Sequence, residues 1–108
     1  MSEQLPQPNE IARLNDAFRK VGPAPDWYVT QGVRLLPDHQ GLIQAVQDFD
    51  DFNPGLDAYG EHDMGEIHWH TNKVWFKFDY YDQQLQYWCD PLSPDCRRVL
   101  TILLASEY

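Results

Sequence analysis

Residues 66–81 read Glu-Ile-His-Trp-His-Thr-Asn-Lys-Val-Trp-Phe-Lys-Phe-Asp-Tyr-Tyr, and this stretch decides the fold that the sequence predicts. Apolar and polar side chains alternate on both sides of Thr71-Asn72, which is the pattern of two half-buried strands joined by a short turn. A turn at these two residues would place Ile67 opposite Phe76. The stretch therefore predicts an antiparallel hairpin with one apolar face.

The residues after this hairpin extend the prediction towards the C-terminus. A second turn near Asp82-Gln83 would add a third strand on the same apolar face. In it, Leu85, Tyr87 and Cys89 would lie opposite Tyr80, Phe78 and Phe76. Ser93-Pro94-Asp95 is typical of a helix start, and the apolar run from Val99 to Ala105 would continue that helix against the sheet. A strand over residues 98–104 is the competing interpretation, since short apolar runs fit both structures.

The N-terminal half predicts two helices and one strand. The first helix covers residues 10–21, begins after Asn9 and stops at Gly22-Pro23. Residues 27–35 alternate as a strand does.

The second helix starts at Asp38 and ends around Asp51, ahead of the turn signal Asn53-Pro54-Gly55. An extended loop follows over residues 52–60. The resulting order α-β-α-β-β-β-α predicts an α+β fold, in which helices pack on one face of a largely antiparallel four-stranded sheet.

The length of 108 residues fits one domain with one core, which we assign to residues 9–108. Residues 1–8 are polar and interrupted by proline, so we expect a flexible N-terminal tail. The sequence has no apolar run near the roughly 20 residues that cross a bilayer and no secretion-signal pattern at its start. We therefore expect a soluble protein located in the cytoplasm.

The charge of this protein is concentrated in one part of the chain. Between Leu35 and Asn72 there is no Lys or Arg, although this stretch contains eight of the 17 acids. These acids are Asp38, Asp48, Asp50, Asp51, Asp57, Glu61, Asp63 and Glu66. They account for −8 of the formal net charge of −9. Binding to nucleic-acid phosphates or anionic lipid needs clustered basic residues, so we predict no direct nucleic-acid partner and no membrane partner.

Four segments resemble a family of small bacterial proteins of unknown function. They are Phe49-Asp50-Asp51-Phe52, Gly60-Glu61-His62-Asp63-Met64-Gly65, Phe76–Asp82 and Val99–Tyr108. The resemblance covers about residues 10–108, with departures at Met64, where the family usually has Phe, and in the spacing of residues 91–95. The family has no established activity, so the resemblance assigns none to this chain. Because members are often carried on plasmids and prophages, it implies an accessory protein of a mobile element.

The leading functional hypothesis is a non-enzymatic, protein-binding inhibitor that mimics a nucleic acid, as anti-CRISPR or anti-restriction proteins do. Carboxylates on a rigid body can imitate phosphate spacing and occupy the basic surface of a host protein, and apolar neighbours would anchor the contact. The partner-binding residues that we expect are Asp48, Asp50, Asp51, Asp57, Glu61, Asp63, Glu66, Phe52 and Tyr59.

Two other hypotheses remain open at this stage. A metal-dependent enzyme could use His62, Asp63, His68 and His70, since a His-x-His pair with a nearby carboxylate can bind a transition metal. Glu61-His62-Asp63 could equally fix a loop through side-chain hydrogen bonds. No nucleophile motif is present, so we assign no catalytic residue and no cofactor.

The third hypothesis is a structural or dimerising module, because adjacent exposed aromatic side chains commonly mark an interface. Trp75, Trp88 and Tyr81 would form such a face, and we expect a monomer or a homodimer. Cys89 and Cys96 fit no common zinc spacing. We expect them to be free thiols, although a disulfide between them is possible.

Overall fold

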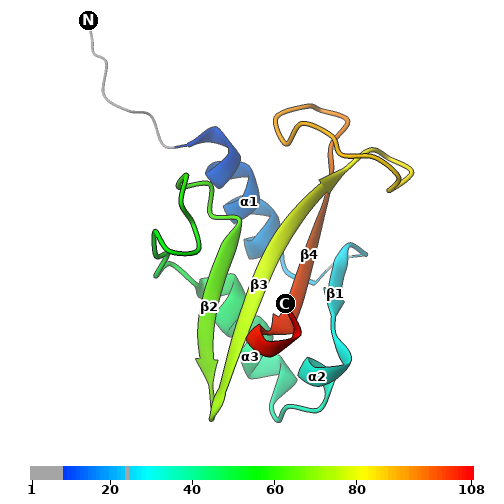
Figure 1. The fold of residues 1–108 in the computed structure, drawn as a ribbon. Coiled ribbons are helices and arrows are strands. Elements are labelled where there is room, and N and C mark those ends of the chain that lie inside the picture. Colours follow the sequence, from blue (N-terminus) through cyan, green and yellow to red (C-terminus); the bar gives the residue numbers. More distant parts are fainter. Residues whose placement is uncertain (1–8, 24) are drawn as a thin grey trace, which may run out of the picture.

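The structure is a computed structural model that describes residues 9–23 and 25–108 (Figure 1). Its elements, in chain order, are α1 (Glu10–Val21), β1 (Trp27–Val29), α2 (Gln31–Arg34), α3 (His39–Asp48), β2 (Met64–Trp69), β3 (Asn72–Tyr81), β4 (Arg97–Leu104) and the 3₁₀ helix η1 (Ala105–Glu107). The predicted α+β class is confirmed. The predicted flexible tail, residues 1–8, lies outside the described residues.

The first helix follows its sequence signals closely. The side-chain oxygen of Asn9 accepts hydrogen bonds from the backbone N–H groups of Ile11 (2.9 Å) and Ala12 (3.4 Å), so Asn9 caps α1 as predicted. Gly22 follows the helix with a φ of 101°, a conformation that residues with a Cβ rarely adopt. Both ends of α1 are therefore fixed by local chemistry.

The predicted strand over residues 27–35 is right for its first three residues and wrong for the rest. After β1, the hydroxyl of Thr30 accepts a hydrogen bond from the N–H of Val33 (3.4 Å) and caps the short helix α2. The carboxylate of Glu107 accepts hydrogen bonds from the Thr30 hydroxyl (2.6 Å) and the Gly32 N–H (3.1 Å). A residue at the far end of the chain thus stabilises the helical turn.

Asp38 caps α3 as predicted, and its backbone adopts the left-handed conformation, with a φ of 57°. The helix ends at Asp48, earlier than the predicted end near Asp51. Phe49 leaves the helix with extended backbone and packs its ring against the core. Residues 52–60 form a loop with no helix or strand, in agreement with the prediction.

β2 and β3 form the predicted antiparallel hairpin, but the turn is His70-Thr71 and not Thr71-Asn72. His70 enters the turn at a φ of 56°. The predicted register is therefore wrong, because Ile67 lies opposite Val74 and not opposite Phe76. The predicted faces are nevertheless correct, because a shift of the partner by two residues keeps every side chain on its own side.

Contacts on both faces of the hairpin account for the observed register. Gly65 pairs with Phe76, and a Cβ at this position would overlap the rings of Phe76 and Phe49. On the other face the indole N–H of Trp75 donates to the carboxylate of Glu66 (2.8 Å) across the strands. Gly65 leaves room for the aromatic rings on the core face of the hairpin, and the hydrogen bond between Trp75 and Glu66 holds the same register on the other face.

The C-terminal part departs most from the prediction. The predicted strand that would contain Leu85, Tyr87 and Cys89 and the predicted helix from Ser93 are both wrong, because residues 82–96 form a long connection and β4 follows. The alternative strand over residues 98–104 is correct. Side chains on both faces of β4 are buried: Val99, Leu100, Ile102 and Leu103. An almost continuous apolar run therefore fits a central strand that is covered on both sides.

The four strands lie in the order β1-β4-β3-β2, with β4 parallel to β1 and antiparallel to β3. α1 and α3 pack on the same face of this sheet, which is largely antiparallel as predicted (Figure 1). The buried core residues come from α2, α3 and three strands: Val33, Leu42, Val46, Ile67, Val74, Phe76, Phe78, Leu100 and Ile102. This core holds α3 and the start of β2 close to α1.

Candidate functional site

Three exposed acids lie at the C-terminal end of α3. Asp48 is the last helical residue, and Asp50 and Asp51 follow it closely. The last turn of α3 contains no basic residue, although the negative end of the helix dipole disfavours carboxylates there. Within residues 9–23 and 25–108, no ion pair includes any of these three acids.

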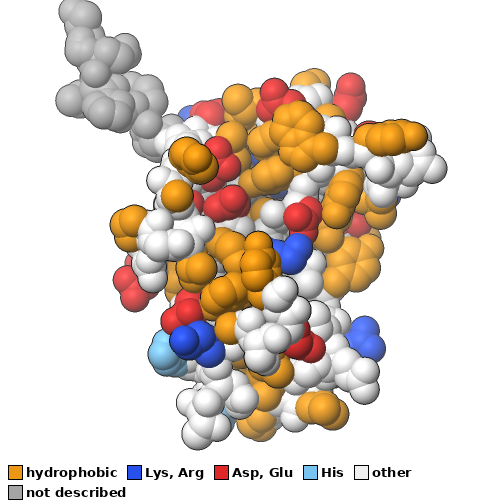
Figure 2. All heavy atoms as spheres, viewed as in Figure 1, with side chains coloured by type: hydrophobic (Ala, Val, Ile, Leu, Met, Phe, Trp, Pro, Cys, Tyr) orange, Lys and Arg blue, Asp and Glu red, His pale blue; other side chains and the backbone are white. Residues whose placement is uncertain are grey.

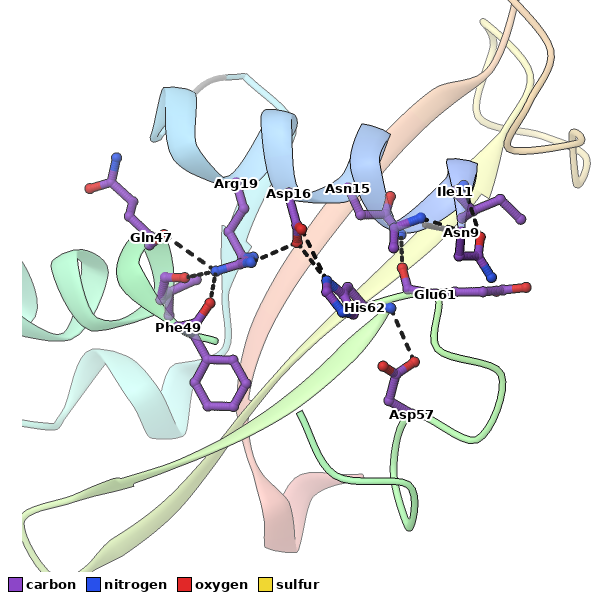
Figure 3. A network of polar contacts seen from close by, with 12 residues as sticks. Asn9, Ile11, Asn15, Asp16, Arg19, Gln47, Phe49, Asp57, Glu61 and His62 are labelled. Atoms are coloured by element: carbon purple, nitrogen blue, oxygen red, sulfur yellow. Dashed lines mark hydrogen bonds and ion pairs between the residues drawn. The ribbon is translucent and has the colours of Figure 1, made fainter. Parts of the chain in front are cut away.

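A buried arginine of α1 satisfies the carbonyl groups at this end of α3. Arg19 is 1% exposed, and its Nη1 donates to the carbonyl oxygens of Val46 (2.6 Å) and Phe49 (2.9 Å) (Figure 3). Its Nη2 donates to the carboxylate of Asp16 (2.8 Å). The guanidinium also lies over the ring of Phe52, 5.4 Å from the centroid. Arg19 therefore joins α1, α3 and the following loop.

The same aspartate holds the histidine of the Glu61-His62-Asp63 segment. Nδ1 of His62 lies 2.9 Å and 3.0 Å from the two carboxylate oxygens of Asp16 (Figure 3). The imidazole stacks on Phe52, with ring centroids 3.9 Å apart and the planes at 5°. The backbone of His62 has a φ of 55°, which is uncommon for a residue with a Cβ. These contacts attach the loop to α1.

Two further carboxylates turn inward in this loop. Asp57 is 7% exposed and accepts a hydrogen bond from the His62 N–H (3.0 Å). Burial, together with the neighbouring carboxylates of Asp57 and Glu61, raises the pKa of Asp63 to about 6. Asp63 therefore keeps its proton to a higher pH than an ordinary aspartate does, and in the protonated form it can donate a hydrogen bond to Asp57.

Asn15 links this loop to the sheet. Its Nδ2 donates to the carbonyl of Glu61 (3.1 Å) and to the hydroxyl oxygen of Tyr80 (2.9 Å), and its Oδ1 accepts from Arg98 (2.8 Å). Burial is the main reason that the pKa of Tyr80 is raised to about 12, and the charges of Asp63 and Glu61 add to it. The start of β2 is thus held by hydrogen bonds from α1.

A pocket of about 410 Å³ opens between α1 and α3 beside this network. Its lining residues are Asp16, Arg19, Lys20, Gln44, Gln47, Asp48, Phe49, Asp50, Phe52 and His62. The pocket therefore connects the buried Arg19–Asp16–His62 network with two of the exposed acids at the end of α3.

The predicted partner-binding residues divide into three groups. Asp48, Asp50, Asp51 and Tyr59 are exposed, and Tyr59 is 84% exposed. Glu61, Asp63 and Glu66 are half-buried. Asp57 and Phe52 face the protein interior, where they hold the backbone and the ring of His62.

The structure does not bring the four predicted metal ligands together. His62 contacts Asp16, whereas His68 is exposed and contacts Glu66 (3.1 Å). His62 precedes β2 and His68 lies near its end, so the two are about 20 Å apart along the strand. Across the described part of the chain, no group of three or more His, Cys, Asp or Glu side chains could hold a metal ion.

The predicted aromatic face is partly covered and partly open. Trp75 is half-buried and packs against Tyr108, with ring centroids 5.2 Å apart. Trp88 is 70% exposed, and Figure 2 shows hydrophobic side chains at the end of the molecule where residues 82–96 lie. Cys89 and Cys96 are free thiols, as expected.

Sequence reasoning missed the residues of α1 that build this network. The apolar residues Ile11, Leu14 and Phe18 indicate the buried face, yet these three are only half-buried. The buried positions are Ala12, Asn15 and Arg19, which share a neighbouring face through their spacing of three and four residues. The available signal was that Asn15 and Arg19 follow Ala12 at helical spacing, which indicates that a polar and a charged side chain share one face of α1.

Together these features define a small α+β protein with a packed polar network on one side and an acidic helix end beside it. The chain belongs to the family described as "Protein of unknown function (DUF3768)", which it matches over residues 29–107. This agrees with the resemblance noted in the sequence. No curated protein and no solved structure matches the chain. Among the described residues, no helix is long and apolar enough to cross a membrane.

Proposed function

We propose that this protein is a small accessory protein of a mobile element that acts without catalysis in the cytoplasm. It would bind a basic surface of a host protein through the exposed residues Asp48, Asp50, Asp51 and Tyr59, which we call the acidic surface. The observation that carries the proposal is the set of three carboxylates at the negative end of α3, outside every ion pair of the described residues.

The position of these acids argues for an external partner. Carboxylates at a helix C-terminus reduce the stability of the helix, and each can lower it by a few tenths of a kcal/mol or more. Arg19 donates to the carbonyl groups of this helix end but forms its ion pair with Asp16. The exposed carboxylates have no ion pair among the described residues, and Asp48 accepts a hydrogen bond from the neutral side chain of Gln44 (3.0 Å). A feature that weakens the fold is readily explained if the same charges attract arginine or lysine side chains of another protein.

Tyr59, in the loop that follows α3, would add an aromatic side chain suited to an interface. Tyr59 is exposed, and Nδ2 of Asn9 donates to its carbonyl oxygen (3.1 Å), which ties this part of the loop to the start of α1. Aromatic residues that are held in place commonly dominate binding energy, while surrounding charges speed association. The half-buried Glu61, Asp63 and Glu66 would extend the negative potential beyond the surface itself.

A basic partner with such a complementary surface would most simply be a nucleic-acid-binding protein. Its groove attracts phosphates through clustered Lys and Arg, and the acidic surface would compete for that groove. The proposed activity is therefore inhibition by nucleic-acid mimicry, of the anti-CRISPR or anti-restriction kind. Mimicry predicts that the inhibitor and the nucleic acid exclude each other from the partner.

The test uses the full chain without a tag, coupled to resin and incubated with lysate of the bacterial host at low and high salt. We expect a basic protein to be retained at low salt, to elute at high salt and to lose its nucleic acid in a gel-shift competition. The triple variant Asp48→Asn/Asp50→Asn/Asp51→Asn should lose both effects, because each change removes a charge and keeps the side-chain shape.

The matched control neutralises three acids elsewhere: Glu10→Gln, Asp79→Asn and Asp95→Asn. It has the same net charge as the test variant, so it separates the acidic surface from a general charge effect. If the control variant loses binding as strongly as the test variant, or if nucleic acid and inhibitor bind the partner together, the proposal is wrong.

A further inference from the structure

The strand β2 is a free edge of the sheet. Among residues 9–23 and 25–108, its only strand neighbour is β3, to which it is joined by antiparallel pairing. The N–H of Phe78 donates to the carbonyl of Asp63 (2.9 Å), so every second residue from Asp63 onwards bonds to β3. The backbone groups of Met64, Glu66 and His68 therefore point away from the sheet, and no backbone hydrogen bond to another described segment involves them.

This edge lacks three of the common features that prevent pairing with another chain, although it carries the charged residue Glu66. β2 contains no lysine and no proline, and its pairing with β3 runs from Met64 to Trp69 without a bulge. The other edge of the sheet, β1, has only three residues and is continued directly by the capped helix α2. Natural edge strands that are left long and regular are commonly paired, so β2 is the edge that requires a partner.

We propose that β2 pairs with β2 of a second copy, antiparallel about a two-fold axis at Ile67, and joins the two sheets into one. In this register Glu66 of each copy lies opposite His68 of the other copy. The backbone N–H and C=O groups of both residues face away from β3, so they are free to form hydrogen bonds between the two copies. Gly65 lies opposite Trp69 of the second copy, so the smallest side chain meets the largest. The strand is thus complementary to itself in charge and in size.

The residues that flank β2 support the same arrangement. Its start is preceded by the acids Glu61 and Asp63, and its end is followed by His70 and the basic Lys73. Antiparallel pairing sets the acidic end of one strand beside the basic end of the other, which offsets part of the repulsion between two acidic chains. A parallel pair would set like charges together at both ends.

Neighbouring registers are less favourable. An axis at Glu66 would place the two Glu66 side chains opposite each other, and like charges in directly opposed positions destabilise a sheet. An axis at His68 would pair fewer residues and place the two His68 side chains opposite each other. Of these three registers, the axis at Ile67 alone combines two pairs of a carboxylate with an imidazole, which can hydrogen-bond, with full overlap of the strands.

The first test measures the mass of the full chain by light scattering from low micromolar to submillimolar concentrations. We expect a dimer that dissociates on dilution and a monomer for the variant His68→Pro. The N–H of His68 faces away from β3, so proline removes a bond to the second copy and none within the hairpin. Circular dichroism would confirm that the variant is folded. A native protein that stays monomeric, or a folded His68→Pro variant that dimerises like the native protein, would overturn the proposal.

The second test exchanges the charges. His68→Glu should raise the dimer dissociation constant about tenfold, because it places two carboxylates opposite one another twice. Glu66→Lys should raise it similarly, because it removes from both pairs the carboxylate that accepts a hydrogen bond from His68. The double variant Glu66→Lys/His68→Glu restores opposite charges and should recover the native constant. Asp79→Lys on β3 is the control and should have little effect. A folded double variant that dimerises no better than the singles would exclude this register, independently of whether the acidic surface binds a host protein.

Discussion

Two groups of carboxylates in this protein have opposite surroundings. The inward group consists of Asp16, Asp57 and Asp63. The outward group consists of Asp48, Asp50 and Asp51. The first group contacts His62, Arg19 or another carboxyl in half-buried or buried positions, whereas the second is exposed and outside every ion pair of the described residues. The residue type is the same, so the tertiary surroundings decide which aspartates hold the fold and which remain available to a partner.

The largest change in stability that this contrast predicts is the one caused by replacing Arg19. Arg19→Met would leave the carboxylate of Asp16 and the carbonyl groups of Val46 and Phe49 without their buried donor. We expect the free energy of unfolding to fall by about 3 kcal/mol or more, measured by urea denaturation. Arg13→Met removes an exposed ion pair with Glu10 and should change stability by less than about 0.5 kcal/mol. Equal effects of the two variants would contradict a special role for Arg19.

The second prediction concerns His62, which links the inward group to the loop. His62→Ala removes the stacking on Phe52 and the contact with Asp16, and we expect a loss of about 2 kcal/mol in the same assay. His62→Asn should lose less, since asparagine tolerates a positive φ and can still bond to Asp16. His68→Ala serves as the exposed control and should be nearly neutral to monomer stability. If the His62→Ala and His62→Asn variants are equally stable, the proposed link between His62 and the inward group is wrong.

The third prediction is a pH dependence centred on Asp63. Its pKa rises from 3.8 to about 6 on folding, so between about pH 4 and pH 6 the folded state holds a proton that the unfolded state has lost. The contribution of Asp63 to stability therefore decreases as the pH rises through this range and is lowest above it. The pKa difference corresponds to about 3 kcal/mol for a shielded group, and because Asp63 is half-buried we expect about 1 kcal/mol.

Asp63→Asn tests this directly, because the amide cannot ionise and can still donate a hydrogen bond to Asp57. Melting temperatures should be higher than those of the native protein at pH 7.5 and nearly equal at pH 4. Asp95→Asn, at an exposed position, should show no such difference. A variant that is stabilised equally at both pH values would show that ionisation of Asp63 is not the cause.

The smallest effect on stability is expected for the outward group. Asp48→Asn/Asp50→Asn/Asp51→Asn removes three charges from the negative end of the α3 dipole, and the free energy of unfolding should rise by up to about 1 kcal/mol. Partner binding should be lost at the same time, so stability and function would change in opposite directions. A clear loss of stability in urea would mean that these acids belong to the fold, and would remove the contrast with the inward group.

Local signals in the sequence were sufficient wherever neighbouring residues supply the contacts. Asn9 and Asp38 cap their helices as predicted, because a cap needs only the next few N–H groups. The alternation in residues 66–81 gave the correct faces of the hairpin for the same reason. It did not give the register, since the turn at His70-Thr71 depends on the space that Gly65 leaves for the rings of Phe76 and Phe49.

The candidate site was only partly visible in the sequence. Glu61-His62-Asp63 was found as a polar segment that could fix a loop, and the exposed acids were found from the missing Lys and Arg. Asp16 is 46 positions from His62, and no sequence pattern links the two. The burial of Asp57 and the stacking of Phe52 likewise depend on contacts with His62, so the sequence did not show that Asp57 is buried and that Phe52 packs inward.

By itself, the sequence determined the fold class, both long helices, the two-sided character of the hairpin and the concentration of acids in one part of the chain. These features follow from residue spacing and from capping groups close to one another in the chain. Only the tertiary structure decided that residues 97–104 form a central strand, since an apolar run fits a helix or a strand until both of its faces are covered. It also separated inward from outward aspartates, because burial and ion pairing depend on partners that lie far away in the sequence.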